Sequence, residues 1–359
     1  MITKNKNIHF KLLYIFFCFL SPIIFFFSTD NVYAKAFKIN NIEISKPFEM
    51  KFDKNKVIDE GFEKAFLELI KLITDSADQE KVNQIKLNEI KGMVESFTIK
   101  EEKFIDETYF VNLGVTFNKK EIFKFLGNKN IFPSTPTKKK LIFIPVIINE
   151  NQKELMIFSK NKIYEEWNSY NKSYHLIEYI LPEEDLEDLD LIKSKFDFIE
   201  QYNFKDVIEK YNLEDSIVSL IFINKEEIRI LSKILINDKE ILKNQTFSNV
   251  NIYDEDDIRM IIEKLKIIYE DYWKQLNQIN TSIKLSLNIK IDANNNSKIS
   301  NFEYTLNNLD LIGNFYISNF NNDFVFYNVI FNGTPGNFLK IMKDNDLNFD
   351  TQNKIWSLK

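Results

Sequence analysis

The sequence predicts an α+β fold, made of three small α/β modules with mixed or antiparallel sheets. Two observations lead to this prediction. In some segments apolar residues recur every three or four positions, as on one face of a helix. Between them lie segments in which apolar residues recur at every second position, as in a half-buried strand. A proline-containing stretch and a later change of pattern also divide the chain, so we expect modules at 35–132, 141–245 and 246–359, with a linker at 133–140.

The first 34 residues resemble a secretory signal peptide in composition. Lysines precede a nearly unbroken apolar run at 12–27, and the short side chains of Val32 and Ala34 stand where a signal peptidase reads the chain. The run is shorter than the roughly 20 residues that a membrane-spanning helix needs. We therefore expect a signal peptide at 1–34 and export to the periplasm. The alternative is an uncleaved anchor, in which case only this segment would meet the membrane.

The first module, 35–132, is expected to contain one main helix over a small sheet. Apolar residues from Ile58 to Ile73 recur at spacings of three and four, which predicts that helix. The full set of expected elements comprises strands at 37–44, 94–99 and 109–117 and helices at 58–73, 82–93 and 119–126. Pro133 and Pro136, among small polar residues, then predict an extended linker.

The second module, 141–245, begins with a continuous apolar run at 141–148 that suits a fully buried strand. The acidic stretch 183–190 is interpreted as a loop leading into a short helix rather than as a ligand site. The other expected elements are strands at 176–181, 216–223 and 228–236 and helices at 162–170 and 204–211. This alternation of helices and strands is typical of an α/β arrangement.

The third module, 246–359, opens with the longest amphipathic helix of the chain. Asp254 can cap it, acidic residues follow in its first turn, and its apolar stripe extends from Ile258 to Ile279. Strict alternation at 283–291 then predicts a half-buried strand. Further elements are expected as strands at 302–306, 315–320, 323–331 and 355–358 and a helix at 334–344.

The net charge and the distribution of basic residues argue against one class of partner. The chain has a formal net charge of −6, and its only basic block after the leader is 138–140. Nucleic-acid binding requires clustered cations that neutralise phosphates, so we expect no nucleic-acid partner. The single cysteine, Cys18, lies within the predicted signal peptide, so we expect no disulfide in the exported part.

Short apolar patterns along most of the exported part resemble an uncharacterised family of exported bacterial proteins, the domain of unknown function 2066 family. The segments that carry the resemblance are 65–74, 94–102, 109–118, 141–146, the region around Trp167, and 331–339 leading to Trp356. The resemblance implies export and a non-enzymatic role in the cell envelope. It supplies no catalytic residue that could be transferred to this chain.

Few residues are suited to catalysis. His175 is the only histidine after the leader, which argues against zinc, copper and a histidine-based triad, and we interpret it as structural. The seven glycines form no phosphate-binding or dinucleotide fingerprint, and no serine lies in a nucleophile elbow. We therefore assign no catalytic, cofactor-binding or metal-binding residue, expect no cofactor, and favour a binding protein over an enzyme.

Two motifs allow a functional interpretation beside a structural one. The spacing of a calcium-binding loop is matched in part by Asp292, Asn294, Asn296 and Glu303. Ser297 replaces the usual glycine and the entering segment alternates as a strand, so a hairpin turn is preferred. The aromatic cluster of Tyr269, Tyr272 and Trp273 could form a peptide-binding face, but it follows the apolar stripe and is expected in the core.

These observations favour an exported envelope protein that acts through protein–protein contacts in envelope assembly or maintenance, with other envelope proteins as partners. The rival hypothesis is a periplasmic hydrolase that cleaves glycan or peptide with paired carboxylates. A deep cleft with two inward carboxylates would favour the hydrolase. Open sheet edges would favour the binding protein.

Overall fold

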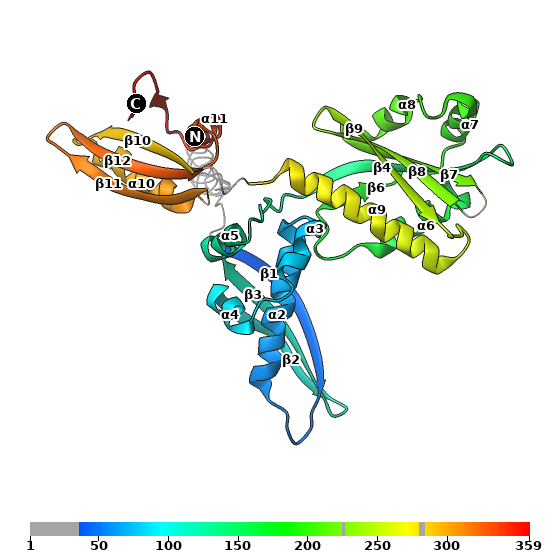
Figure 1. The fold of residues 1–359 in the computed structure, drawn as a ribbon, viewed down its shortest axis with the longest axis horizontal. Coiled ribbons are helices and arrows are strands. Elements are labelled where there is room, and N and C mark those ends of the chain that lie inside the picture. The colour runs from blue at the N-terminus through cyan, green and yellow to red at the C-terminus, as the bar shows by residue number, and fades with distance from the viewer. Residues whose placement is uncertain (1–35, 225–226, 280–283, 310) are drawn as a thin grey trace, which may run out of the picture.

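The computed structural model describes residues 36–224, 227–279, 284–309 and 311–359 (Figure 1). Helices pack against three separate sheets, which are mixed or antiparallel, so the predicted α+β fold is confirmed. The predicted signal peptide at 1–34 lies outside the described residues. Over the described ranges, no helix is both long and apolar enough to cross a bilayer.

The N-terminal module is a three-stranded sheet covered on one face by helices. Its sheet has the order β1-β3-β2, with β3 antiparallel to both neighbours. Phe66, Leu113 and Phe117 are buried between the sheet and its helices. The elements are β1 (Ala36–Pro47), α2 (Lys54–Ile73), α3 (Ser76–Gln79), η2 (Glu80–Val82), α4 (Leu87–Met93), β2 (Val94–Ile105), β3 (Thr108–Asn118) and α5 (Lys119–Asn128).

The central module has three layers, with helices on both faces of a mixed sheet. The sheet has the order β5-β4-β7-β8-β9, and β6 also pairs with β4. Its strands are β4 (Lys139–Asn149), β5 (Glu154–Met156), β6 (Ile177–Ile180), β7 (Ser216–Asn224), β8 (Glu227–Ile236) and β9 (Lys239–Ser248). Its helices are η3 (Phe158–Lys160), α6 (Lys162–Glu166), η4 (Trp167–Tyr170), α7 (Leu186–Ser194), η5 (Phe196–Phe198), α8 (Lys205–Ile208), η6 (Glu209–Tyr211) and α9 (Glu255–Leu276).

Helix α9 packs differently from the prediction, which placed it in the C-terminal module. Its apolar stripe is buried in the core of the central sheet, together with Phe143 and Trp167. Tyr269 and Trp273 are buried in this core and Tyr272 packs beside it, so the predicted core role of the aromatic cluster is confirmed. Asp254 caps the helix as predicted, because its side chain accepts hydrogen bonds from two backbone N–H groups of the first turn.

The C-terminal module is a five-stranded sheet with the order β11-β12-β10-β14-β13. Strand β10 is antiparallel to β12 and parallel to β14. The elements are β10 (Lys284–Asp292), α10 (Asn296–Asn308), β11 (Ile312–Phe320), β12 (Phe324–Asn332), α11 (Pro335–Asp344), β13 (Phe349–Asp350) and β14 (Ile355–Leu358).

The strand expected at 302–306 is wrong, because these residues lie in α10. Phe302 and Leu306 are buried, and Ile299 packs against the same core. The residues that face the core are thus spaced by three and four positions, as in a helix, rather than by two, as in a strand. Asn295 begins the helix by accepting a hydrogen bond from the backbone N–H of Lys298. A helix therefore joins β10 to β11.

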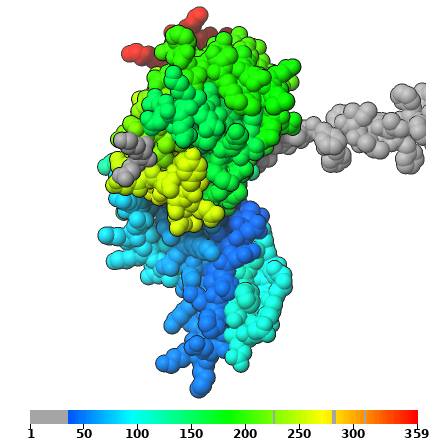
Figure 2. Space-filling model, turned by 90° about the vertical axis from the view of Figure 1, so that its right-hand side faces the viewer, coloured from blue at the N-terminus to red at the C-terminus, as the bar shows by residue number. Residues whose placement is uncertain are grey.

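The segment expected to be an extended linker, 133–140, makes hydrogen bonds with two helices. The backbone N–H of Ser134 donates to the carbonyl of Ile73 at 2.7 Å, and that of Thr135 donates to the carbonyl of Asn277 at 3.1 Å. Ser134 is buried. The segment is thus held between the end of α2 and the end of α9, and it joins the N-terminal and central modules firmly. Figure 2 shows α9, in yellow, lying against the blue N-terminal module.

Candidate functional site

His175 lies just before β6, half-buried beside α9. Its Nδ1 accepts a hydrogen bond from the backbone N–H of Lys172 at 3.2 Å. Burial, together with the nearby ammonium groups of Lys266, Lys274 and Lys172, lowers the pKa of His175 to about 4. The imidazole is therefore neutral at the pH of most compartments and orders the turn before β6, which fits the structural interpretation of this residue.

This histidine should make the protein sensitive to mild acid. In the unfolded chain His175 is protonated below its ordinary pKa of 6.5, whereas in the folded chain it stays neutral down to about pH 4. The free energy of unfolding should therefore fall as the pH is lowered through this range. The loss should be about 1–2 kcal/mol, after allowing for solvent screening of a half-buried ring. His175→Asn keeps an acceptor for the Lys172 N–H group and should flatten the profile. Urea unfolding between pH 7 and pH 4 tests this, and parallel profiles for the two proteins would refute it.

The partial calcium motif lies in a turn between a strand and a helix, so the hairpin turn expected there is wrong. The side chain of Asp292, at the end of β10, accepts a hydrogen bond from the backbone N–H of Asn294 at 2.9 Å. Glu303 lies within α10 and accepts a hydrogen bond from the Tyr327 hydroxyl at 2.6 Å. Within the described part of the chain, no group of three or more His, Cys, Asp or Glu side chains is placed to hold a metal ion.

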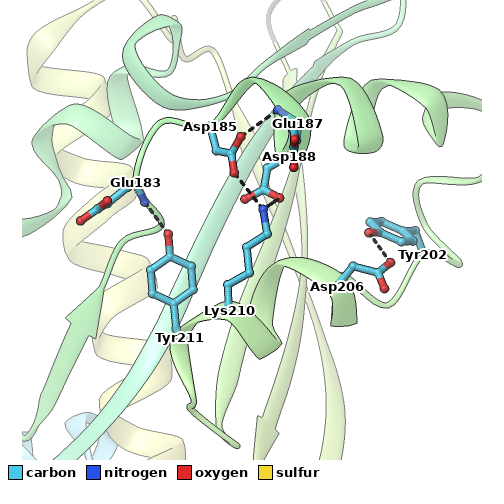
Figure 3. A network of polar contacts seen from close by, with 8 residues as sticks. All are labelled: Glu183, Asp185, Glu187, Asp188, Tyr202, Asp206, Lys210 and Tyr211. Carbon is cyan, nitrogen blue, oxygen red and sulfur yellow. Dashed lines mark hydrogen bonds and ion pairs between the residues drawn. The ribbon is translucent and has the colours of Figure 1, made fainter.

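The acidic stretch 183–190 forms a loop and the start of α7, as predicted (Figure 3). Lys210 ties it to the end of η6, because its ammonium group contacts Asp185 at 2.8 Å and Asp188 at 2.6 Å. The backbone N–H of Glu183 donates to the Tyr211 hydroxyl at 2.7 Å. The network therefore holds α7 and η6 together on one face of the central sheet.

The chemistry of this network does not suit a carboxylate-based hydrolase. A general acid needs a raised pKa in order to hold its proton near neutral pH. Hydrogen bonds from Lys210 lower the pKa of Asp185, and hydrogen bonds from Ser159 lower that of Glu184. Both carboxylates are thus held in the ionised form, in contacts that stabilise structure.

A row of charged side chains on α9 is buried, and sequence reasoning did not identify it. Lys266, Glu270 and Lys274 succeed one another by one helical turn and are 0, 3 and 4 % exposed. The Glu270 carboxylate accepts hydrogen bonds from the backbone N–H groups of Leu176 and Ile177, each at 2.9 Å. Burial raises the pKa of Glu270 and lowers the pKa of Lys266 to about 8.

Lys274 connects this row to the N-terminal module. Its ammonium group donates to the carbonyl oxygens of Lys71 at 2.6 Å and Thr74 at 3.2 Å, at the C-terminal end of α2. A cation there is favoured by the helix dipole and by otherwise unpaired carbonyls. Lys274 therefore forms a joint between the two modules, while Glu270, in the same buried row of α9, holds the start of β6 within the central module.

The edge strands of the three sheets differ in how they are protected against pairing with another chain. Proteins protect exposed edges with charged side chains, with proline, or by making the edge strand very short. Three of the long edge strands carry several charges each: β1 has Lys38, Glu43 and Lys46, β2 has Glu95, Lys100, Glu101, Glu102 and Lys103, and β9 has Lys239, Glu240 and Lys243. Strand β13 has only two residues.

Strand β11 lacks these three protections, and its only irregularities are register shifts against β12 at 312–314 and 317–319. Its nine residues, Ile312–Phe320, include no charged residue and no proline, and its neighbour β12 is equally uncharged. Tyr316, Ile317 and Phe320 are 52, 51 and 76 % exposed. The first residues of β11 line a hollow shared with α5, so the free edge is 315–320. Among the described strands, β11 is thus the long edge best suited to accept another strand, and Figure 1 shows it at the margin of the C-terminal sheet.

Comparison with known proteins found no matching family model and no matching curated protein. The resemblance to the domain of unknown function 2066 family therefore remains a prediction.

Proposed function

We propose that the chain is an exported envelope protein that binds an extended segment of a partner protein as an additional strand along β11. The observation that carries the proposal is the unprotected edge at 315–320. An edge strand presents unpaired backbone N–H and C=O groups, and a partner strand gains affinity by pairing with them. Contacts of this kind would serve envelope assembly or maintenance.

The side chains along β11 define what the partner must bring. Tyr316 lies opposite Asn328 and Ile317 lies opposite the buried Tyr327, so successive residues here point to the two faces of the sheet, up to a register shift between Ile317 and Asn319. Both β11 and β12 lack charges. An uncharged partner segment with alternating apolar residues would complement them, because a charge placed there would lose solvation without gaining a counter-charge.

Charge introduced on the edge should abolish this binding. We expect the double variant Ile317→Lys, Phe320→Lys to capture its envelope partners at least tenfold less well than the wild type, by the same effect with which lysines protect natural edges. The matched control is Leu242→Lys on the protected edge β9, where the side chain is similarly exposed. Pull-down from envelope fractions measures capture, and thermal melts confirm that both variants fold. Equal capture by the β11 variant and the control would contradict the proposal.

Export is the second part of the proposal and is supported by the signal-like pattern at 1–34. We expect cell fractionation to find the protein in the periplasm, and N-terminal sequencing to start at Lys35. A full-length product in the cytoplasm would contradict export. It would also remove envelope proteins as the class of partner, while leaving the β11 edge open to test.

A further inference from the structure

A hollow of ≈ 600 Å³ lies on the central module, on the face of the sheet that α7 covers. The hairpin before β5, the turn η3 and helix α7 surround it. Its floor contains Leu155, Ile157 and Phe158, all buried. Its volume falls within the ~300–1,000 Å³ that is typical of small-molecule sites. Apolar residues form its floor, and charged residues, among them Lys153, Glu184 and Lys193, surround it.

The carboxylates around this hollow already have partners. Glu184 accepts a hydrogen bond from the backbone N–H of Ser159 at 2.8 Å. Asp185 is paired with Lys210, and Glu154 is paired with Lys160 at 3.9 Å. These groups therefore have reduced capacity to bind a cationic ligand.

Two ammonium groups at the rim have no such partner. Lys153, in the turn before β5, and Lys193, in the last turn of α7, both line the hollow and are exposed. Within the described residues, neither side chain makes a hydrogen bond or an ion pair. The charged groups left free are thus both donors, and they complement an anionic group above an apolar floor.

The backbone at Phe158 supports the idea that the floor is a built feature. Phe158 has φ of 56°, in the left-handed region that a bulky residue rarely adopts. The Phe158 ring is buried in the floor, and the next backbone N–H group, that of Ser159, donates to Glu184. Surrounding contacts must hold such a conformation in place, since it costs about 1–2 kcal/mol.

We propose that this hollow binds a single-chain aliphatic carboxylate, with its chain on Leu155, Ile157 and Phe158 and its carboxylate at Lys153 and Lys193. An aliphatic carboxylate offers hydrogen-bond acceptors only, which matches the two free donors. A peptide would also bring amide N–H groups that need acceptors, and the side-chain acceptors of the rim are engaged. The site is separate from the β11 edge, which lies in another module, so each can fail without the other.

The test titrates dodecanoate, below its micelle concentration, into the full mature chain by calorimetry. We expect saturable one-to-one binding that weakens at least tenfold in the double variant Lys153→Gln, Lys193→Gln. Lys243→Gln, an exposed lysine of the same module that lies outside the hollow, should bind like the wild type. Leu189→Asp, which places a carboxylate in the lining and repels an anionic ligand, should also abolish binding.

Two further ligands test whether binding requires both the aliphatic chain and the carboxylate. Dodecanol has the chain without the charge and should bind the wild type at least tenfold more weakly than dodecanoate. A short apolar peptide with a free carboxylate should bind more weakly as well. Absence of saturable dodecanoate binding, equal binding by the double variant, equal binding of dodecanol, or preference for the peptide would each overturn the proposal.

Discussion

Replacing Glu270 by alanine should destabilise the protein by about 3–5 kcal/mol, the cost of removing one partner from a buried charge network. The substitution removes the counter-charge that the buried ammonium groups of Lys266 and Lys274 share, although Asp271 and Asp75 remain near Lys274. It also leaves the backbone N–H groups of Leu176 and Ile177 without an acceptor at the start of β6. Urea unfolding, followed by tryptophan fluorescence, measures the loss.

Two variants control for this prediction. Glu270→Gln keeps one acceptor for the backbone N–H groups and should lose less stability than Glu270→Ala. Glu263→Ala removes an exposed carboxylate of the same helix, whose pairing with Lys172 at 3.8 Å should be worth no more than about 1 kcal/mol. If Glu270→Ala unfolded at the same urea concentration as Glu263→Ala, the stability of the protein would not depend on the buried charge of Glu270.

Trp167→Ala should cost about 3–5 kcal/mol, as is usual for truncating a large buried aromatic side chain. Trp167 is fully buried and stacks on Phe143 with ring centroids 3.9 Å apart. Tyr179 meets its edge at 5.2 Å, and the Lys266 ammonium group lies 5.1 Å from its ring. Its loss would therefore open a cavity and remove one of the two cation–π contacts of Lys266, which also donates to the side chain of Asn171.

The matched control for Trp167→Ala is Trp356→Ala in the C-terminal module. Trp356 is only partly buried, with Phe338 and Phe349 at 6.0 and 6.4 Å, so its loss should cost less than about 2 kcal/mol. Chemical unfolding of both variants gives the comparison. Similar losses would mean that the aromatic cluster around Trp167 is not a main source of stability in the central module.

The elements with the strongest periodicity were predicted well from the sequence. Alternation at 283–291 predicted β10, and the apolar stripe with its Asp254 cap predicted α9, because local patterns determine these elements. The sheet on which α9 packs was not predictable in this way. An apolar stripe records that a helix is buried but not against which partner, and both neighbouring modules offer apolar strands.

The errors have identifiable physical causes. Residues 302–306 alternate between apolar and polar, so the short window suited a strand, while the Asn295 cap that begins α10 was one of many asparagines in the chain. The prolines at 133 and 136 predicted an extended linker, but they gave no indication that its backbone groups have partners in α2 and α9. A proline fixes local geometry without excluding tertiary contacts.

The functional features depend on tertiary structure more than on sequence. Each charged residue of the buried row, Lys266, Glu270 and Lys274, follows a buried apolar residue of α9 by one position. The sequence shows this spacing, but charged residues at such positions are typical of a solvent-exposed helix face. The strand at 315–320 was predicted, but its position at the edge follows from the order β11-β12-β10, which sequence periodicity does not determine. The sequence shows that this strand has no charged residue. That fact bears on partner binding only once the strand order places the strand at the edge of its sheet.

Strand addition at β11 can be tested most directly by photo-crosslinking in the native envelope. A photoreactive phenylalanine analogue replaces Tyr316 on the free edge or, as the matched control, Tyr304 on α10 of the same module, which is 68 % exposed. The account predicts a crosslinked partner from position 316, its loss when Ile317→Lys is added, and none of that species from position 304. No crosslink from position 316, or one that persists unchanged with Ile317→Lys, would contradict it.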